Sequence, residues 1–568
     1  MPERVTKRKV KRKLKIGNLI LFIAIIFGVV LGISFGIKLL GSVKDNSIIK
    51  DYYLGSKNPE VELYIYDNET DLMTKEMVAY RGTMVTSNDK KKVVDEIEYT
   101  KIKFQEQEYY VLNDVLVEKV EDCVQEIEKY VRTSVTVYKN EVDSKIESFV
   151  KKGNKLEILG YDKLDETGQV NMYNVKYQDI EGWVYEKYLV DNLEEAQTNY
   201  NENNVYDTHK KRKFSYELYG GKASTLDYYP YEKIEFEDNP LLKNAKTMYL
   251  NSGADTMKKI DKYLEIAVNY GVNAIVVDIK DGALAYPSEV AKEYSKTAYK
   301  TSINKLNTYE NVIKKIKDAG IYAIGRIVVF NDVHYGKDHP EDCIKSTVSS
   351  QLWPSGFSRG AWEYNVELAK EAVKLFGFNE IQFDYVRFPE SAYEMSKNKK
   401  TDFKNKYNEE KAEAIQNFLI YATDEIHKVG AYLSVDVFGE CSGTYVTSYG
   451  QYWPAISNVV DVISSMPYTD HFGRNVDTWS NAYQTVYNWA KGAVKRQTEI
   501  PTPAVARTWI TAYNTPHWNP TVVYGAQKIS DQARALVDAG LKGGFITWNS
   551  ASSLAKYNEI KSAFAKDY

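Results

Sequence analysis

Carboxylate side chains follow several apolar runs in the second half of the chain. The polar groups that end these runs are Asp278-Ile279-Lys280-Asp281, Asp332, Asp384-Tyr385-Val386-Arg387, Asp436 to Glu440, and Tyr468-Thr469-Asp470-His471. Two neighbouring carboxyl groups can do acid–base chemistry when their surroundings keep one protonated and leave the other ionised. The sequence therefore predicts a site built from paired carboxylates, provided that the fold brings two of them together.

The elements that must position these groups alternate between helices and strands. At five junctions an amphipathic stretch stops at a glycine and an apolar run follows, namely at Gly271, Gly320, Gly377, Gly430 and Gly540. Glycine ends helices in this way because it tolerates the left-handed conformation. The eight candidate strands are Lys246–Leu250, Ala274–Lys280, Tyr322–Phe330, Glu380–Val386, Tyr432–Phe438, Val460–Met466, Val505–Thr511 and Gly544–Trp548.

This alternation predicts an α/β fold, a (β/α)8 TIM barrel whose active site lies at the C-terminal ends of the strands. An open, doubly wound sheet fits the same alternation. Its dinucleotide-binding form has little support, because no Gly-x-Gly-x-x-Gly sequence opens the first helix.

Successive side chains of a strand point to opposite faces, so the alternation also predicts which groups line the barrel. The polar residues predicted to face inward are Asp278, Lys280, Arg326, Glu380, Gln382, Asp384, Ser434 and Asp436. One explanation is a structural network in which Arg326 and Lys280 neutralise Glu380 and Asp278. For Asp384 and Asp436, which lie near strand ends, we expect a functional role.

The N-terminal region predicts a membrane anchor. Eight Lys and Arg residues crowd residues 1–15, and Leu19 to Ile37 carries no charge. As a helix this stretch is about 28 Å long, enough to cross the hydrocarbon core of a bilayer. Residues 1–15 would be a basic cytoplasmic tail, residues 16–38 a single transmembrane helix, and the remainder extracellular. A cleaved signal peptide is the alternative, but its apolar core would be shorter and a small-residue cleavage site would follow.

Two small β modules and a linker are predicted before the barrel. Short β-type runs joined by polar turns indicate all-β modules at residues 60–120 and 128–191. Residues 192–240 are mostly polar and predict a linker, and residues 241–568 form the barrel. The three cysteines cannot make a disulfide framework, and the net charge of −4 gives no whole-chain attraction to nucleic acid.

The string Ile180-Glu181-Gly182-Trp183-Val184-Tyr185-Glu186-Lys187-Tyr188-Leu189 resembles the end of bacterial Src-homology-3-like domains. The resemblance implies a cell-wall-binding or spacer module over about residues 130–190. A small barrel in which Trp183 only fills the core is the alternative.

A second resemblance rests on Phe383-Asp384-Tyr385-Val386-Arg387-Phe388-Pro389, with supporting strings at residues 273–281, 324–332 and 434–439. Together they resemble the glycosyl hydrolase TIM-barrel domain of bacterial membrane-anchored or secreted proteins, over about residues 241–557. Two strings depart from the usual pattern of that family, Met466 to His471 and Arg507 to Thr511. These departures affect the sixth and seventh strands.

The second resemblance implies hydrolysis of glycosidic bonds in cell-wall or extracellular polysaccharide. Such cleavage uses two carboxyl groups about 5–9 Å apart, a spacing that Asp384 and Asp436 on neighbouring strands can meet. We expect Asp384 to be the nucleophile or charge stabiliser, kept ionised by Arg387, and Asp436 to be the acid. Glu440 and Asp278 are rivals for the acid. The expected substrate-binding residues are Asp278, Lys280, Arg326, Asp332, Gln382, Arg387, Glu440, Tyr468, His471, Trp509, Trp548 and Asn549.

The sequence contains no zinc-binding, phosphate-loop or serine-nucleophile motif, so we expect neither a metal nor a cofactor. The expected partners are a polysaccharide or peptidoglycan-type substrate and the membrane, and not nucleic acid. The alternative is a non-catalytic carbohydrate- or cell-wall-binding protein with a glycosidase-like barrel. A second carboxylate that can be assigned beside Asp384 would favour the enzyme.

Overall fold

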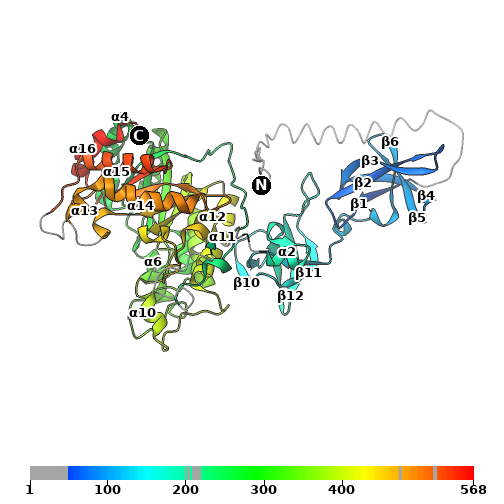
Figure 1. The fold of residues 1–568 in the computed structure, drawn as a ribbon, viewed down its shortest axis with the longest axis horizontal. Coiled ribbons are helices and arrows are strands. Elements are labelled where there is room, and N and C mark those ends of the chain that lie inside the picture. The colour runs from blue at the N-terminus through cyan, green and yellow to red at the C-terminus, as the bar shows by residue number, and fades with distance from the viewer. Residues whose placement is uncertain (1–48, 199, 201–204, 207–218, 473–475, 516–520) are drawn as a thin grey trace. The chain divides into compact units, whose positions relative to one another are not determined.

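The structure is a computed structural model that describes residues 49–198, 200, 205–206, 219–472, 476–515 and 521–568. The described residues fall into two compact units, one up to Thr198 and one from Tyr200 to Tyr568 (Figure 1). Each unit is described by itself.

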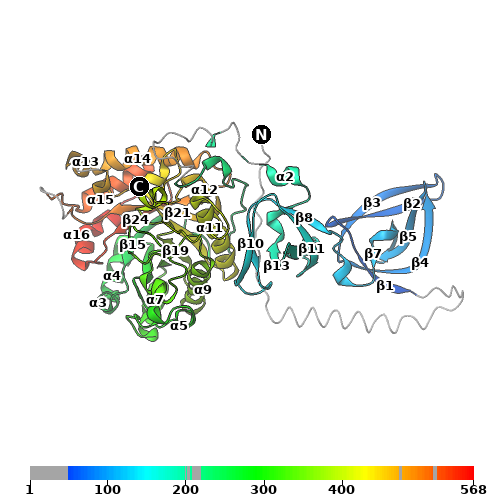
Figure 2. The same ribbon diagram turned by 90° about the horizontal axis from the view of Figure 1, so that it is seen from below.

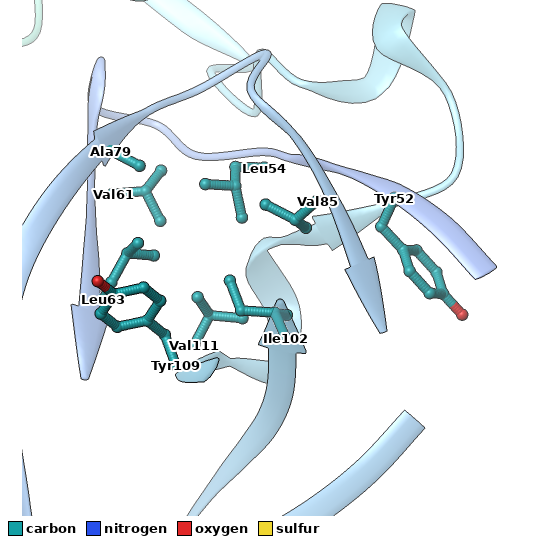
Figure 3. Packing of buried hydrophobic residues seen from close by; sticks show 9 residues of the cluster. All are labelled: Tyr52, Leu54, Val61, Leu63, Ala79, Val85, Ile102, Tyr109 and Val111. Atoms are coloured by element: carbon teal, nitrogen blue, oxygen red, sulfur yellow. The ribbon is translucent and has the colours of Figure 1, made fainter. Parts of the chain in front are cut away.

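The N-terminal unit begins with a seven-stranded antiparallel sheet in the order β3-β2-β6-β5-β4-β1-β7. Its strands are β1 (Lys50–Leu54), β2 (Glu60–Asp67), β3 (Leu72–Tyr80), β4 (Met84–Val94), β5 (Ile97–Phe104), β6 (Gln107–Leu112) and β7 (Leu116–Val117). Apolar residues alternate along these strands and meet in one core cluster. Figure 3 shows Leu54, Val61, Leu63, Ile102 and Val111 pointing toward one another in that cluster.

A second antiparallel sheet follows in the same unit, in the order β10-β9-β13-β12-β11-β8-β14. Its strands are β8 (Glu128–Val131), β9 (Val135–Tyr138), β10 (Ile146–Val150), β11 (Lys155–Tyr161), β12 (Met172–Tyr177), β13 (Ile180–Tyr185) and β14 (Leu189–Val190), and the short helix α2 (Leu193–Gln197) comes after them. The Src-homology-3-like character of this module and the predicted domain boundaries stay predictions.

The second unit is built on a parallel sheet in the order β22-β21-β20-β19-β18-β16-β15-β24-β23. The strands are β15 (Ala245–Leu250), β16 (Ala274–Asp281), β18 (Tyr322–Val328), β19 (Glu380–Asp384), β20 (Tyr432–Phe438), β21 (Val462–Met466), β22 (Val505–Ala506), β23 (Thr508–Thr511) and β24 (Gly544–Trp548), with β17 (Ala283–Leu284) antiparallel to β16. All five junction glycines have positive φ, between 67° and 107°.

Helices cover the outside of this sheet (Figure 2). They are α3 (Ala254–Lys258), α4 (Ile260–Tyr270), α5 (Glu289–Tyr294), α6 (Lys296–Tyr299), α7 (Leu306–Asp318), α8 (Val333–Asp338), α9 (Arg359–Phe376), α10 (Ala392–Lys397), α11 (Lys411–Lys428), α12 (Trp453–Val459), α13 (Val476–Ser480), α14 (Ala482–Gln497), α15 (Ala526–Ala539) and α16 (Leu554–Phe564). Connections of this kind put helices on the outer face, so both faces of the sheet are buried.

The predicted closed eight-stranded barrel is corrected to a nearly closed barrel of nine parallel strands. The difference arises at the predicted strand Val505–Thr511, which is divided at Arg507 into β22 and β23. The two pieces pair with different neighbours, β22 with β21 and β23 with β24. The chain changes its pairing at Arg507: the Arg507 N–H still donates to Ile463 O of β21, and the ladder with β24 begins at Thr508. The buried Arg507 guanidinium binds Glu380 of β19.

The membrane-anchored part of the predicted fold class is also corrected. The predicted transmembrane segment, residues 16–38, lies outside the described residues, as does the basic tail, residues 1–15. Within the described ranges no helix has the length and apolar character needed to span a bilayer. The two longest described helices, α9 and α11, have 18 residues each and carry charged side chains along their length.

Part of the predicted linker packs against the barrel. The buried residues Tyr206, Ala223, Leu226 and Tyr228 form one apolar cluster with Ala412, Val446, Tyr452 and Ala455. Lys233 donates to the carbonyl oxygens of Asn458 and Val460, at the end of α12. The described residues from 219 to 240 therefore belong to the same packed unit as the barrel.

Candidate functional site

Arg326 on β18 binds three carboxylates at the carboxyl ends of the strands. Its Nη1 lies 2.7 Å from Asp278 Oδ1 and 3.1 Å from Asp281 Oδ2, and its Nη2 lies 2.6 Å from Asp384 Oδ2. Burial alone would lower the pKa of Arg326, but Asp384 and Asp278 outweigh it and raise the pKa well above its usual value. One guanidinium shared by three carboxyl groups leaves an excess of acidic groups at this point.

Asp436 on β20 lies next to this cluster and is completely buried. Its Oδ2 is 3.8 Å from Arg326 Nε, and its Oδ1 accepts a hydrogen bond of 2.7 Å from the indole N–H of Trp509. Burial and the nearby negative charge of Asp384 raise the pKa of Asp436 well above its ordinary value, against the opposing effects of Arg326 and Trp509. Asp436 is therefore the carboxyl group of the site that favours the protonated form.

Asp278 on β16 has a second buried partner. The hydroxyl of Tyr249 on β15 donates to Asp278 Oδ2 at 2.5 Å. Burial raises the pKa of Asp278 to about 6, although Arg326 acts in the opposite direction. Asp281 is the most accessible member of the cluster, since 47% of its side chain is exposed, whereas Asp384 keeps 9%.

An aromatic wall lies beside the carboxylates. Trp548 is half-buried, its ring is 5.4 Å from that of Trp509, and it stacks on Tyr468 at 6.4 Å. His471 is exposed and packs edge-on against Tyr468 at 5.2 Å. The Arg326 guanidinium lies 5.7 Å from the centre of the Trp548 ring. Tyr468 and Trp509 are buried, so the partly exposed ring of Trp548 is the part of this cluster that can pack against the apolar face of a sugar ring.

Three buried polar atoms on neighbouring strands have no hydrogen-bond partner within the described part of the chain: Arg326 Nε, Gln382 Oε1 and Asp436 Oδ2. Gln382 Nε2 reaches Ser464 Oγ at 3.2 Å, and Ser464 is the register partner of Asp436. The Gln382 amide therefore lies in the same layer as the Asp436 carboxyl. Together these atoms offer one donor and two oxygens to a hydroxyl group or a water molecule.

Other predicted site residues make contacts of their own. Lys280 donates to Asp332 Oδ2 at 2.5 Å and to Asn365 Oδ1 of α9 at 2.8 Å, because the register shift between Asp278 and Lys280 re-aims its side chain. Asp332 also caps α8 by accepting the N–H groups of His334 and Tyr335. Asn549 donates to Ser553 O at 3.2 Å, next to the start of α16.

Arg387 and Glu440 contact other residues than the carboxylates beside which we expected them. Arg387 donates to Phe388 O at 3.1 Å and to Glu390 Oε1 at 2.9 Å, so Arg326 occupies the place beside Asp384 that we expected of Arg387. Glu440 is exposed and accepts the hydroxyl groups of Tyr445 and Tyr449 at 2.5 and 3.0 Å.

The structural network expected for Arg326 and Lys280 has different members. Glu380 is paired with Arg507, whose Nη1 lies 2.8 and 3.0 Å from the two carboxylate oxygens, and Arg326 binds Asp278. Both side chains of the Glu380–Arg507 pair are fully buried. This pair therefore holds strands together at the opposite end of β19 from Asp384.

Tyr249 and Tyr385 are site residues that the sequence reasoning missed. Tyr249 shares the inward parity of Thr247 on the first strand, so strand alternation could have found it. Tyr385 follows Asp384 and has φ of 54°, which no sequence pattern signals. In the described ranges, no group of three or more His, Cys, Asp or Glu side chains is arranged to hold a metal ion.

Comparisons with known proteins gave one family match and no match to a curated protein. A family model described as "Putative glycosyl hydrolase domain" matches residues 247–554, more than half of the 568 residues. No curated protein matches the chain.

Three solved structures illustrate what the chain is similar to. A hypothetical protein from Ruminiclostridium thermocellum is 35% identical over 34% of this chain and 97% of its own, with a TM-score of 0.28. The glycoside hydrolase domain of PgaB (BpsB) from Bordetella bronchiseptica is 10% identical over 57% of this chain and 100% of its own, with a TM-score of 0.43. An exo-β-N-acetylglucosaminidase from Vibrio harveyi is 11% identical over 56% of this chain and 54% of its own, with a TM-score of 0.36.

Proposed function

The chain belongs to the glycosyl hydrolase family whose model matches residues 247–554, and from this premise we propose that its barrel hydrolyses glycosidic bonds of a polysaccharide with Asp384 and Asp436. Asp384 is the ionised group that acts as nucleophile or charge stabiliser. Asp436 is the protonated group that assists the leaving oxygen.

One observation carries this proposal: two carboxyl groups beside the same guanidinium have opposite surroundings. Asp384 forms an ion pair of 2.6 Å with Arg326 Nη2, whereas Asp436 is fully buried and has a raised pKa. Such a difference assigns acid and base roles in a pair of carboxyl groups. The excess of acidic groups around Arg326 also suits the positive charge that develops on the sugar in the transition state.

The substrate is proposed to be a cell-wall or peptidoglycan-type polysaccharide. Support comes from the half-buried Trp548, whose ring centre lies 5.7 Å from the Arg326 guanidinium beside the carboxylates, and from the exposed His471.

The test is to incubate the full chain with purified wall polysaccharides and to measure new reducing ends. Asp384→Asn is expected to abolish their release. Glu380→Gln is the control, because Glu380 pairs with Arg507 away from the site, and its release per folded molecule is expected to persist. Equal release by Asp384→Asn and the unsubstituted chain would contradict the assigned role.

A carbohydrate-binding barrel without turnover is the second candidate. It is favoured because Asp436 is completely buried and because Asp384, paired with Arg326, keeps only 9% of its side chain exposed, so neither carboxyl group is open to a substrate in this structure. Co-sedimentation with the same polysaccharides separates the two functions. Retention of the polymer with no new reducing ends in any preparation supports the binding protein and contradicts the hydrolase.

A further inference from the structure

Tyr385 has an unusual backbone conformation directly after Asp384. Its φ of 54° lies in the left-handed region, which is unfavourable for a residue other than glycine. The N–H of Tyr385 donates to Asp384 Oδ1 at 2.6 Å, and its carbonyl oxygen accepts the N–H of Arg387 at 2.9 Å. The chain thus turns sharply just where β19 presents Asp384 to the site.

Arg387 is enclosed by aromatic rings, and one of them belongs to Tyr385. The guanidinium carbon is 4.7 Å from the centre of the Tyr385 ring, 4.5 Å from Phe438, 5.3 Å from Trp353 and 6.0 Å from Tyr449. A guanidinium over a ring face is attracted to it electrostatically. The contacts with Phe438, Trp353 and Tyr449 fix the position of the guanidinium, and its contact with the Tyr385 ring favours the observed conformation of Tyr385.

We propose that Arg387 is a positioning residue, which holds Tyr385 in its left-handed conformation so that the Tyr385 N–H fixes the Asp384 carboxylate. The proposal rests on the proposed role of Asp384. Arg326 binds Oδ2 and the Tyr385 N–H binds Oδ1, so each oxygen of the carboxylate has its own anchor.

The first test is spectroscopic and needs no activity. The sequence contains four Asp–Tyr peptide bonds, at Tyr52, Tyr228, Tyr385 and Tyr568. Labelling Asp carbonyl carbons with ¹³C and Tyr amides with ¹⁵N therefore selects four amide signals in the full chain. In Arg387→Met the Tyr385 amide proton is expected to shift upfield, because its hydrogen bond to Asp384 is lost.

The matched control is Arg359→Met. Arg359 is also a buried guanidinium between rings, 3.9 Å from Trp362 and 4.5 Å from Tyr407, with Glu409 as its ion partner. Arg359→Met is expected to lower stability at least as much as Arg387→Met does, because it leaves the buried Glu409 unpaired whereas Glu390 is exposed, and to leave the Tyr385 signal in place. An unshifted Tyr385 signal in Arg387→Met, or the same shift in both variants, overturns the proposal.

The second test is kinetic. Misplacing a reacting group by about 1 Å costs about 100-fold in rate, so kcat for reducing-end release is expected to fall by about that factor in Arg387→Met, with KM within a few-fold. Glycine adopts positive φ without strain. Adding Tyr385→Gly to Arg387→Met is therefore expected to recover much of the lost kcat, and failure of this rescue overturns the proposal. If the unsubstituted chain releases no reducing ends, the proposed function fails, while the amide signal still decides the role of Arg387.

Discussion

Arg326 Nη2 and Asp384 Oδ2 lie 2.6 Å apart across the neighbouring strands β18 and β19. Both side chains are almost fully buried, so this ion pair forms where water screens little. The same guanidinium also holds Asp278, and its Nε faces Asp436. Arg326 is therefore the centre around which the acidic groups of the site are arranged.

Replacing Arg326 is expected to cost more than replacing one of its carboxylates. Arg326→Met leaves Asp278 and Asp384 buried without their counter-ion, which destabilises by about 3–5 kcal/mol. Asp281→Asn removes only a half-exposed partner and costs about 1 kcal/mol or less. Urea unfolding followed by tryptophan fluorescence measures both, since eight of the nine tryptophans lie in residues 241–568. Equal midpoints for the two variants would contradict this ranking.

The raised pKa of Asp278 predicts a pH dependence of stability with a defined sign. A carboxyl group with a raised pKa contributes stability that is fully present below pH 4 and is lost as the pH rises through about 6. The unfolding free energy of the unsubstituted chain minus that of Asp278→Asn should therefore fall by about 2 kcal/mol between pH 4 and pH 7.

Asp461 provides a control of opposite sign for that measurement. Burial alone would raise its pKa, but His427 and other hydrogen-bond partners outweigh burial and lower it. The unfolding free energy of the unsubstituted chain minus that of Asp461→Asn should therefore rise with pH over the acidic range. Slopes of the same sign for both variants would refute the assignment for Asp278.

The buried Glu380–Arg507 pair is expected to stabilise the fold without taking part in the reaction. Removing either partner leaves one buried charge unpaired, so Glu380→Leu and Arg507→Met should each destabilise by about 3–5 kcal/mol. The double variant should lose clearly less than the sum of the two. Additive losses in urea unfolding would show that the pair is not coupled.

Local patterns were sufficient to predict most of the strands of the barrel and the inward-facing residues of β19. The observed β20 (Tyr432–Phe438) and β24 (Gly544–Trp548) have the predicted bounds. Gln382 and Asp384 make contacts across the barrel interior, as alternation along β19 requires. These features depend only on residues close in sequence, which is why periodicity reveals them.

The partner of each charge could not be predicted, because it depends on register and on interruptions of the strands. Val328 is the register neighbour of Asp384, and Arg326 lies two residues before Val328 on the same face of β18, so the Arg326 side chain can reach the Asp384 carboxylate. Arg387, by contrast, turns away after Tyr385. The register shift after Asp278 sends Lys280 to Asp332. The partner of Arg507 is likewise distant, since Glu380 is 127 residues away in the sequence.

The indole N–H of Trp509 offers a test of Asp436 as the acid. Its hydrogen bond to Asp436 Oδ1 lowers the pKa of that group, although burial and Asp384 dominate and raise it. Trp509→Phe removes the donor and keeps an aromatic ring, so the pKa of Asp436 should rise further. If protonated Asp436 assists the leaving oxygen, the alkaline limb of kcat/KM for reducing-end release should move to higher pH.

Trp548→Phe is the control, because Trp548 stacks on Tyr468 while the bond to Asp436 comes from Trp509. A limb that moves to lower pH in Trp509→Phe, or that moves equally in both variants, would remove Asp436 from the role of acid.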